Sequence, residues 1–148
     1  MVKATIRDVI MISIHPEFAN AIFRGEKKIE FRKLNIPKHI NHIVMYVTAP
    51  EKKIAGYFSV KDVIEAKPSE LWQKFWNVSG TTKEFFFEYY GKQELGLGFL
   101  VGQVNLLQNP ILLDDIAFGS RPPQSFAYVD GELWKTLKRR KKQITSAT

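Results

Sequence analysis

The short segment 25–32 follows the pattern G-x-K-x-x-E-x-R, whose three charged positions are Lys27, Glu30 and Arg32. Residues two apart in a strand point to the same face, so a strand through this segment places Glu30 and Arg32 side by side and puts Lys27 at the turn before them. A lysine and an arginine can bind a phosphate or a base edge, and a carboxylate accepts hydrogen bonds from an exocyclic amine or a ribose hydroxyl. This set predicts a site that recognises a nucleotide rather than one built for catalysis.

A simpler interpretation of the same residues is also open. Glu30 and Arg32 could form an ion pair on an exposed strand face while Lys27 is solvated, and such pairs contribute only about 0 to 1 kcal/mol to stability. On that interpretation the segment carries no binding site.

Histidine and cysteine content limits the chemistry further. Acid–base catalysis of the kind that a ribonuclease uses would depend on His15, His39 or His42, the three histidines of the chain. His39 and His42 are three residues apart, but no third ligand accompanies them, so we predict neither a metal nor a cofactor. The chain has no cysteine, which excludes a thiol nucleophile and any disulfide and favours a reducing compartment.

The elements that would position these residues follow from the spacing of apolar and β-branched side chains. Strands are predicted at 8–14, 28–33, 43–48, 53–64 and 97–107, with an extended segment at 124–129. Helices are predicted from Pro16 to the glycine at 25, at 70–76, at 85–90 and at 130–142. Strands with inserted helices are typical of an α+β domain or a small barrel rather than of a doubly wound sheet.

Single residues predict where these elements bend, begin or end. Gly56 marks a bend or bulge in its strand. Ser69 is predicted to cap the 70–76 helix, and Thr81 with Glu84 to form a capping box before the helix that follows. Pro110 is predicted to lie in a loop.

Length and composition indicate one folded domain. The chain has 148 residues, 45% of them hydrophobic, and no repeat or linker divides it. We therefore predict a single domain over 5–142 and a disordered tail at 143–148. The longest apolar runs are too short to span a membrane and no signal peptide is apparent, so we expect a cytoplasmic protein. A net charge of +7 favours a polyanionic partner such as nucleic acid. The basic run at 138–142 could contact phosphates, although such a run is more commonly a solvated helix end.

The pattern at 25–32 is one of several ordered blocks that resemble the ASCH family of the PUA-like superfamily. The others are Ile-Ser-Ile-His-Pro at 12–16, Tyr-Val-Thr-Ala-Pro at 46–50, Ile-Ala-Gly at 54–56 and Pro-Pro-Gln-Ser-Phe at 122–126. The resemblance covers nearly the whole chain. It implies a PUA-like β-barrel of about five to six mixed strands with flanking and inserted helices, and a charged cleft at the mouth of the barrel that contains Lys27, Glu30 and Arg32.

The leading prediction is a module that binds RNA or a modified nucleotide in this cleft, and such a module could serve regulation. Three further residues are predicted to help hold the ligand, namely Thr48, Arg121 and Gln124. Residues 121–126 would then form a rigid lip over the cleft, or equally a stiff connector that places Phe126 in the core.

Two enzymatic alternatives rest on the same resemblance. Some small bacterial ASCH proteins resemble acetylcytidine amidohydrolases that use the lysine of this motif with a threonine and a glutamate, which would make Lys27 catalytic. Glu30 takes the position of that threonine here, and neither Glu65 nor Glu70 aligns as the carboxylate. Ribonuclease activity is also known in the family.

A third alternative is an adaptor that binds proteins in transcription regulation. The aromatic residues at 72–90 could form its docking surface, and exposure of Trp72 or Phe86 would favour it. Their helical spacing is more typical of core packing, and it leaves only Trp76, Phe87 and Tyr90 as exposed.

Overall fold

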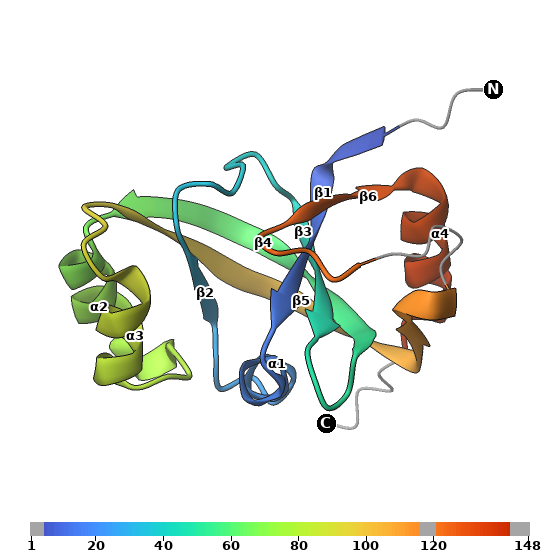
Figure 1. Cartoon of the computed structure of the whole chain (residues 1–148), viewed down its shortest axis with the longest axis horizontal. Coiled ribbons are helices and arrows are strands. Elements are labelled where there is room, and N and C mark those ends of the chain that lie inside the picture. The colour runs from blue at the N-terminus through green and yellow to red at the C-terminus, as the bar shows by residue number, and fades with distance from the viewer. Residues whose placement is uncertain (1–4, 116–120, 143–148) are drawn as a thin grey trace.

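A single mixed sheet forms the centre of the molecule. The computed structural model describes residues 5–115 and 121–142, so the tail predicted at 143–148 lies outside the described residues. The strands are β1 (Thr5–Ile14), β2 (Ile29–Arg32), β3 (His42–Val47), β4 (Lys53–Ala66), β5 (Gly96–Leu112) and β6 (Ala127–Asp130). Their order in the sheet is β2-β5-β4-β3-β1-β6, with β1 and β3 parallel and the other pairs antiparallel (Figure 1).

Helices lie at both ends of the sheet and, in the view of Figure 1, below its middle. They are α1 (Pro16–Phe23), α2 (Pro68–Phe75), α3 (Lys83–Tyr90) and α4 (Gly131–Arg140), with short 3-10 helices η1 (Trp76–Val78) and η2 (Leu113–Asp115). The predicted α+β class with six mixed strands and inserted helices is confirmed, and the arrangement fits a PUA-like fold. None of the helices among residues 5–115 and 121–142 is long and apolar enough to cross a membrane.

The sheet is open where a closed barrel was expected. Among the described strands, β2 and β6 are the two edges, and β2 pairs only with β5. Closure needs backbone pairing between the edges, and a strand of four residues offers little of it. The space beside β2 is instead filled by side chains from β1, α1 and α3, which is where the site described below lies.

β5 extends to Leu112, beyond its predicted end at residue 107, because its pairing with β4 continues past an irregularity. The register of this pair shifts between Ile54 and Gly56, where four residues of β5, including Pro110, lie opposite the single residue Ala55 of β4. Proline is tolerated at such a bulge because the ladder lacks a hydrogen bond there. Pro110 therefore lies within β5 rather than in the predicted loop, whereas Gly56 marks the irregularity as predicted.

Both faces of the central strands are buried. Ile10, Ile12 and Ile43 belong to one cluster together with Ala19 and Ile22 of α1. The alternate residues of β1 and β3 belong to a second cluster with Trp134 and Leu137 of α4. Successive side chains of a strand point to opposite faces, so the uninterrupted apolar run of β1 is what a strand covered on both sides requires.

Two predicted helix caps are wrong by one or two residues. Lys67 is the N-cap of α2 and Pro68 its first helical residue, because proline suits that position and Ser69 already lies in the helix. The N-cap of α3 is Thr82, whose hydroxyl accepts a hydrogen bond from the Phe85 amide at 3.1 Å. Thr81 is thereby free to take part in the site.

The turn that leads from α1 to the site depends on Gly25. Its φ is +79°, and its amide donates to the Ile22 carbonyl while the Glu26 amide donates to the Ala21 carbonyl. These two bonds form a Schellman motif, which satisfies the last carbonyls of the helix. The predicted role of Gly25 at the end of α1 is confirmed, and the turn delivers Lys27 directly to β2.

Replacing Gly25 with alanine should lower the free energy of unfolding by about 1 to 2 kcal/mol, the usual cost of a left-handed backbone conformation for a residue with a Cβ. No atom lies within 4 Å of the position that this Cβ would take, so the expected loss of stability comes from the backbone conformation and not from a steric clash. Gly25→Asn is the control, because asparagine tolerates this conformation better than alanine. Denaturant titrations measure both variants, and equal losses would contradict this explanation.

Candidate functional site

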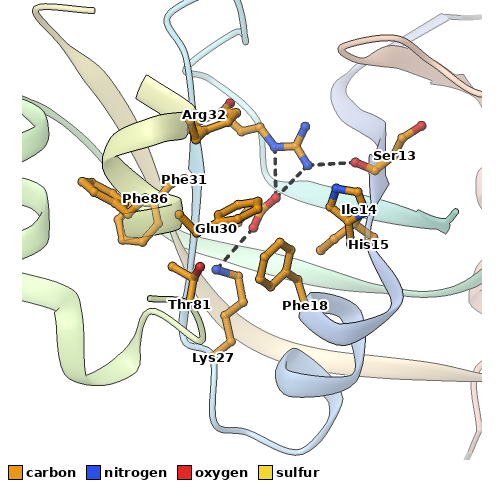
Figure 2. Close-up of a pocket in the computed structure, with 12 residues that line it drawn as sticks. Ser13, Ile14, His15, Phe18, Lys27, Glu30, Phe31, Arg32, Thr81 and Phe86 are labelled. Atoms are coloured by element: carbon orange, nitrogen blue, oxygen red, sulfur yellow. Dashed lines mark hydrogen bonds and ion pairs between the residues drawn. The ribbon is translucent and has the colours of Figure 1, made fainter. Parts of the chain in front are cut away.

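A pocket of about 150 Å³ opens between the end of β1, α1, β2 and α3 (Figure 2). Its walls combine charged, polar and aromatic side chains. They are Ser13, Ile14, His15, Phe18, Lys27, Glu30, Phe31, Arg32, Thr81, Phe85, Phe86 and Tyr89. A cavity of this size holds a single ring the size of benzene. We refer to it as the Lys27 pocket.

Lys27 is buried at the base of this pocket, with only 3% of its surface exposed. The amide of Lys27 donates to the Ala21 carbonyl at 3.1 Å, which fixes the residue to the end of α1. Its Nζ donates to the Ser79 carbonyl at 2.6 Å and lies 3.6 Å from Glu30 Oε1. The backbone of Ser79 thus holds the ammonium from one side and Glu30 from the other.

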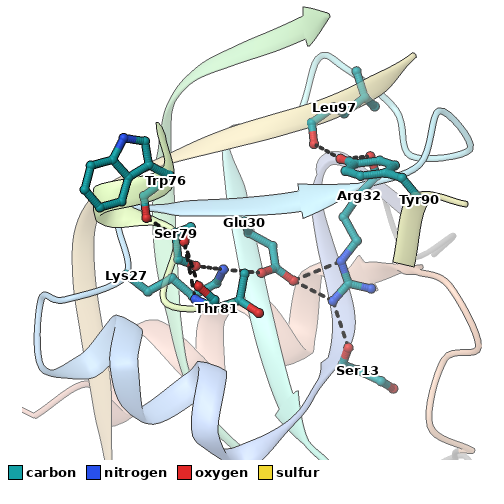
Figure 3. A network of polar contacts seen from close by, with 9 residues as sticks. All are labelled: Ser13, Lys27, Glu30, Arg32, Trp76, Ser79, Thr81, Tyr90 and Leu97. Atoms are coloured by element: carbon teal, nitrogen blue, oxygen red, sulfur yellow. Dashed lines mark hydrogen bonds and ion pairs between the residues drawn. The ribbon is translucent and has the colours of Figure 1, made fainter. Parts of the chain in front are cut away.

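Glu30 lies between two cations. Its Oε2 accepts hydrogen bonds from Nε of Arg32 at 3.0 Å and from Nη2 at 2.7 Å (Figure 3). The same Nη2 donates to the Ser13 carbonyl at 2.9 Å. The side chain of Glu30 is 7% exposed and that of Arg32 17%, so Glu30 is buried and Arg32 half-buried, and the simpler interpretation as an exposed surface pair is wrong. We call Lys27, Glu30 and Arg32 the charged triad.

Burial changes the pKa of one member of the triad, Lys27. It lowers the pKa of Lys27 below its ordinary value, and this effect exceeds the opposing attraction of Glu30, while the nearby Arg32 lowers the pKa further. A lysine whose pKa is lowered loses its proton more readily than a solvated lysine, and the neutral amine is the form that acts as a base or a nucleophile.

Aromatic rings surround the triad. Lys27 Nζ lies 5.4 Å from the ring centroid of Phe18 and 5.3 Å from that of Phe31, within the range of cation–π contacts. Tyr89 closes the wall on the side of α3, and burial raises the pKa of its hydroxyl. A planar base could enter this pocket with its faces against aromatic rings and its edge toward the triad.

The predicted exposures of the aromatic residues are partly wrong. Trp76 is exposed as expected, but Tyr90 is buried, because its hydroxyl donates to the Arg32 carbonyl at 3.0 Å. Phe85 is 43% exposed at the mouth of the pocket, which the sequence had not indicated. Phe86 is buried and Trp72 half-buried, so neither provides the docking surface that would favour an adaptor.

The connector 79–82 between η1 and α3 contributes residues that the sequence analysis missed. Ser79 supplies the carbonyl for Lys27, and Thr81 lines the pocket (Figure 2). Gly80 has a φ of +66°, and a Cβ there would lie 2.7 Å from Cβ of Lys27. The sequence Ser-Gly-Thr-Thr signals a turn, but nothing in it indicates that the turn packs against a lysine 52 residues earlier.

The other predicted ligand-binding residues do not line the Lys27 pocket. The amide of Thr48 donates to the Ile14 carbonyl at 3.0 Å, which places Thr48 just behind the pocket wall. Arg121 and Gln124 are exposed. The segment that contains them is joined to the site through the Ser13 hydroxyl, which donates to the Pro123 carbonyl at 2.7 Å.

Only one of the three histidines lies at the pocket. His15 lines it, stands at the N-cap position of α1 and makes no side-chain capping bond. His39 lies within 3.0 Å of the Arg7 carbonyl, and His42 packs against Trp134 on the opposite side of the sheet. Among the described residues, no group of three or more His, Cys, Asp or Glu side chains is arranged to hold a metal.

Comparison with known proteins identifies the family. The ASCH domain profile matches residues 12–99, more than half of the chain. The chain belongs to the ASCH domain family. The ASCH domain-containing ribonuclease of Zymomonas mobilis subsp. mobilis is 28% identical to it over 130 residues, covering 85% of this chain and 87% of that protein.

Solved structures support the same assignment. The crystal structure of a point variant of the ASCH protein from Zymomonas mobilis has a TM-score of 0.83 at 26% identity, covering 94% of this chain and 100% of that one. The N-terminal domain of Staphylothermus marinus McrB has a TM-score of 0.58 at 12% identity over 95% of this chain and 98% of that chain, and it shares the fold alone. These matches establish the ASCH fold for this chain, and its function has to be inferred from the residues of the site.

The lowered pKa of Lys27 has a measurable effect on the stability of this ASCH domain. Between that lowered pKa and 10.5 the unfolded chain binds more protons than the folded chain. The free energy of unfolding of the wild type should therefore rise relative to that of Lys27→Met as the pH increases through this window.

Denaturant titrations of both proteins at several pH values measure this difference. Tyr89 and Tyr90, whose pKa values burial raises, are present in both proteins, so their contributions cancel. A difference that does not change with pH would contradict a lowered pKa of Lys27.

Proposed function

We propose that this ASCH domain binds and cleaves single-stranded RNA, with one nucleotide held in the Lys27 pocket. The observation that carries the proposal is the charged triad, whose Lys27 and Glu30 are buried and whose Arg32 is half-buried in the wall of an open aromatic pocket large enough for one ring. Membership of the ASCH family and a ribonuclease among its relatives support RNA as the substrate class.

The triad has bonding capacity left for a ligand. Nη1 of Arg32 makes no hydrogen bond with any described residue, so it can donate to a phosphate or a base carbonyl. Oε1 of Glu30 has Lys27 at 3.6 Å as its partner, which leaves room to accept a hydrogen bond from a base amine or a ribose hydroxyl. Recognition would thus use donors and acceptors together.

Cleavage would use the lowered pKa of Lys27. The neutral amine removes the proton of a ribose 2′-hydroxyl, the 2′ oxygen attacks the adjacent phosphorus, and the bond to the 5′ oxygen breaks. His15, at the pocket wall, gives a proton to the departing 5′ oxygen, and Nη1 of Arg32 stabilises the charge that develops on the phosphate.

Substituting Lys27 with methionine should reduce cleavage of a single-stranded RNA oligonucleotide by about 10² to 10⁴-fold, the usual contribution of a positioned base. Binding by the wild type should weaken as salt rises, because phosphate contacts release counterions. Gel analysis of the products and fluorescence anisotropy measure the two effects.

Lys28→Met is the matched control, because Lys28 is the adjacent lysine and its side chain is exposed. This variant should cleave at the rate of the wild type, and circular dichroism confirms that both variants are folded. Cleavage that persists in folded Lys27→Met would remove Lys27 from the reaction, and a wild type that neither binds nor cleaves RNA would overturn the proposal.

A second candidate function is hydrolysis of the acetyl amide of acetylcytidine. One observation favours it, since the pocket brings Lys27, Thr81 and Glu30 together, the three residue types that the resemblance to amidohydrolases requires. The threonine of those amidohydrolases stands at the position that Glu30 occupies here. In this chain the threonine of the pocket is Thr81, which comes from the connector 79–82.

Chromatography of acetylcytidine incubated with the protein separates the two candidates. If the second candidate is correct, cytidine forms with the wild type and fails to form with Lys27→Met and with Thr81→Val. Absence of cytidine with the wild type rejects this candidate and leaves the RNA proposal unaffected.

A further inference from the structure

A second hollow of about 370 Å³ adjoins the Lys27 pocket. It lies between the start of α1, η1, the connector 79–82 and the start of α3. Its walls are Glu17, Phe18, Trp76, Ser79, Gly80, Thr81, Thr82 and Phe85. Phe18, Thr81 and Phe85 line both cavities, so a ligand in one continues into the other without leaving the surface.

Trp76 is the feature of this hollow that packing does not explain. Its side chain is 60% exposed, the highest value among the large hydrophobic residues that the structure describes, and Phe85 beside it is 43% exposed. No aromatic ring within residues 5–115 and 121–142 stacks on Trp76. An indole face left open to solvent at the edge of a cavity is a platform on which a planar ligand can stack.

The same connector that holds Lys27 also fixes Trp76. The Trp76 carbonyl accepts hydrogen bonds from the hydroxyl and the amide of Ser79, at 2.8 and 3.3 Å, and the Ser79 carbonyl accepts from Lys27 Nζ (Figure 3). These bonds hold the backbone of Trp76 close to the residue that binds Lys27, so the exposed indole belongs to the same part of the site.

We infer that the hollow holds a second, adjacent nucleotide of the same RNA strand, with its base stacked on Trp76. This inference rests on the proposed RNA function and specifies its substrate: unpaired RNA of at least two nucleotides. A base can reach Trp76 only when it has left its own stack, which double-stranded RNA does not permit.

Charge in the hollow agrees with recognition of a base rather than a phosphate. Glu17 is its one charged lining residue, so a phosphate is not attracted there. Contact with the phosphates falls to Arg32 in the adjoining pocket. Stacking on an indole accepts any base, so this subsite should show little preference among the four.

Binding of a labelled single-stranded oligouridylate and of uridine monophosphate to the wild type and to Trp76→Ala tests the inference. The variant should bind the oligouridylate about 5- to 150-fold more weakly, the range that corresponds to the loss of one stacked base. Its affinity for uridine monophosphate, which needs only the Lys27 pocket, should not change.

Two further proteins sharpen the test. Trp76→Phe retains a ring and should keep most of the affinity for the oligouridylate. Leu112→Ala removes another exposed apolar side chain, on β5 and outside both cavities, and should bind as the wild type does. Tryptophan fluorescence should be quenched by the oligouridylate in the wild type and much less in Trp76→Phe, a change that a merely structural role would not produce.

The failures of the two proposals are distinguishable. If Trp76→Ala binds the oligouridylate as tightly as the wild type, the second subsite is wrong and the RNA function stands. If the wild type binds double-stranded RNA as well as the single strand, the stacking on Trp76 is wrong. If the wild type binds no RNA at all, the proposed function fails and this inference fails with it.

Discussion

One buried carboxylate connects the segments that make up the site. Glu30 lies on β2, and its two oxygens face Lys27 on one side and Arg32 on the other. Through Lys27 it is linked to the Ser79 carbonyl, and through Arg32 to the Ser13 carbonyl at the end of β1. A single buried cation would be costly, and a carboxylate between two cations reduces that cost. The proposed recognition uses the remaining donors and acceptors of Arg32 and Glu30, and the proposed cleavage uses the pKa of Lys27, which burial lowers.

The open edge of the sheet and the pocket have the same origin. Between β2 and β1 no backbone pairing is present in the described residues, and the Arg32 guanidinium bridges the two strands instead. Backbone pairing between β1 and β2 would close this gap, whereas the side chains that bridge it leave a pocket. The aromatic residues of α1 and α3 line that pocket. The glycines at 25 and 80 let the chain turn closely on either side of Lys27.

Likeness in fold reaches further than likeness in chemistry. The McrB domain shares the fold at 12% identity, whereas the Zymomonas mobilis ASCH protein matches at 26% identity with a much higher TM-score. A common scaffold can carry different sites, so function has to be inferred from residues such as Lys27, Thr81 and Trp76 rather than from the topology. In this chain the connector 79–82 contains Thr81, and its residue Ser79 is hydrogen-bonded to both Lys27 and Trp76.

The sequence by itself determined the local part of this protein. The period of its apolar residues predicted the α+β class and most of its elements, Gly25 predicted the turn after α1, and a spacing of two placed Glu30 beside Arg32. These are properties of neighbours along one element, which bond geometry fixes. Tertiary structure decided the rest. Glu30 is buried because α1, β1 and α3 gather over β2, and Ser79 and Thr81 reach the site from some 50 residues away. Tertiary structure also places Thr48, Arg121 and Gln124 outside the pocket lining. It leaves the edges of the sheet unpaired, so no barrel closes. No spacing in the sequence encodes these outcomes, because they depend on how distant segments pack against one another.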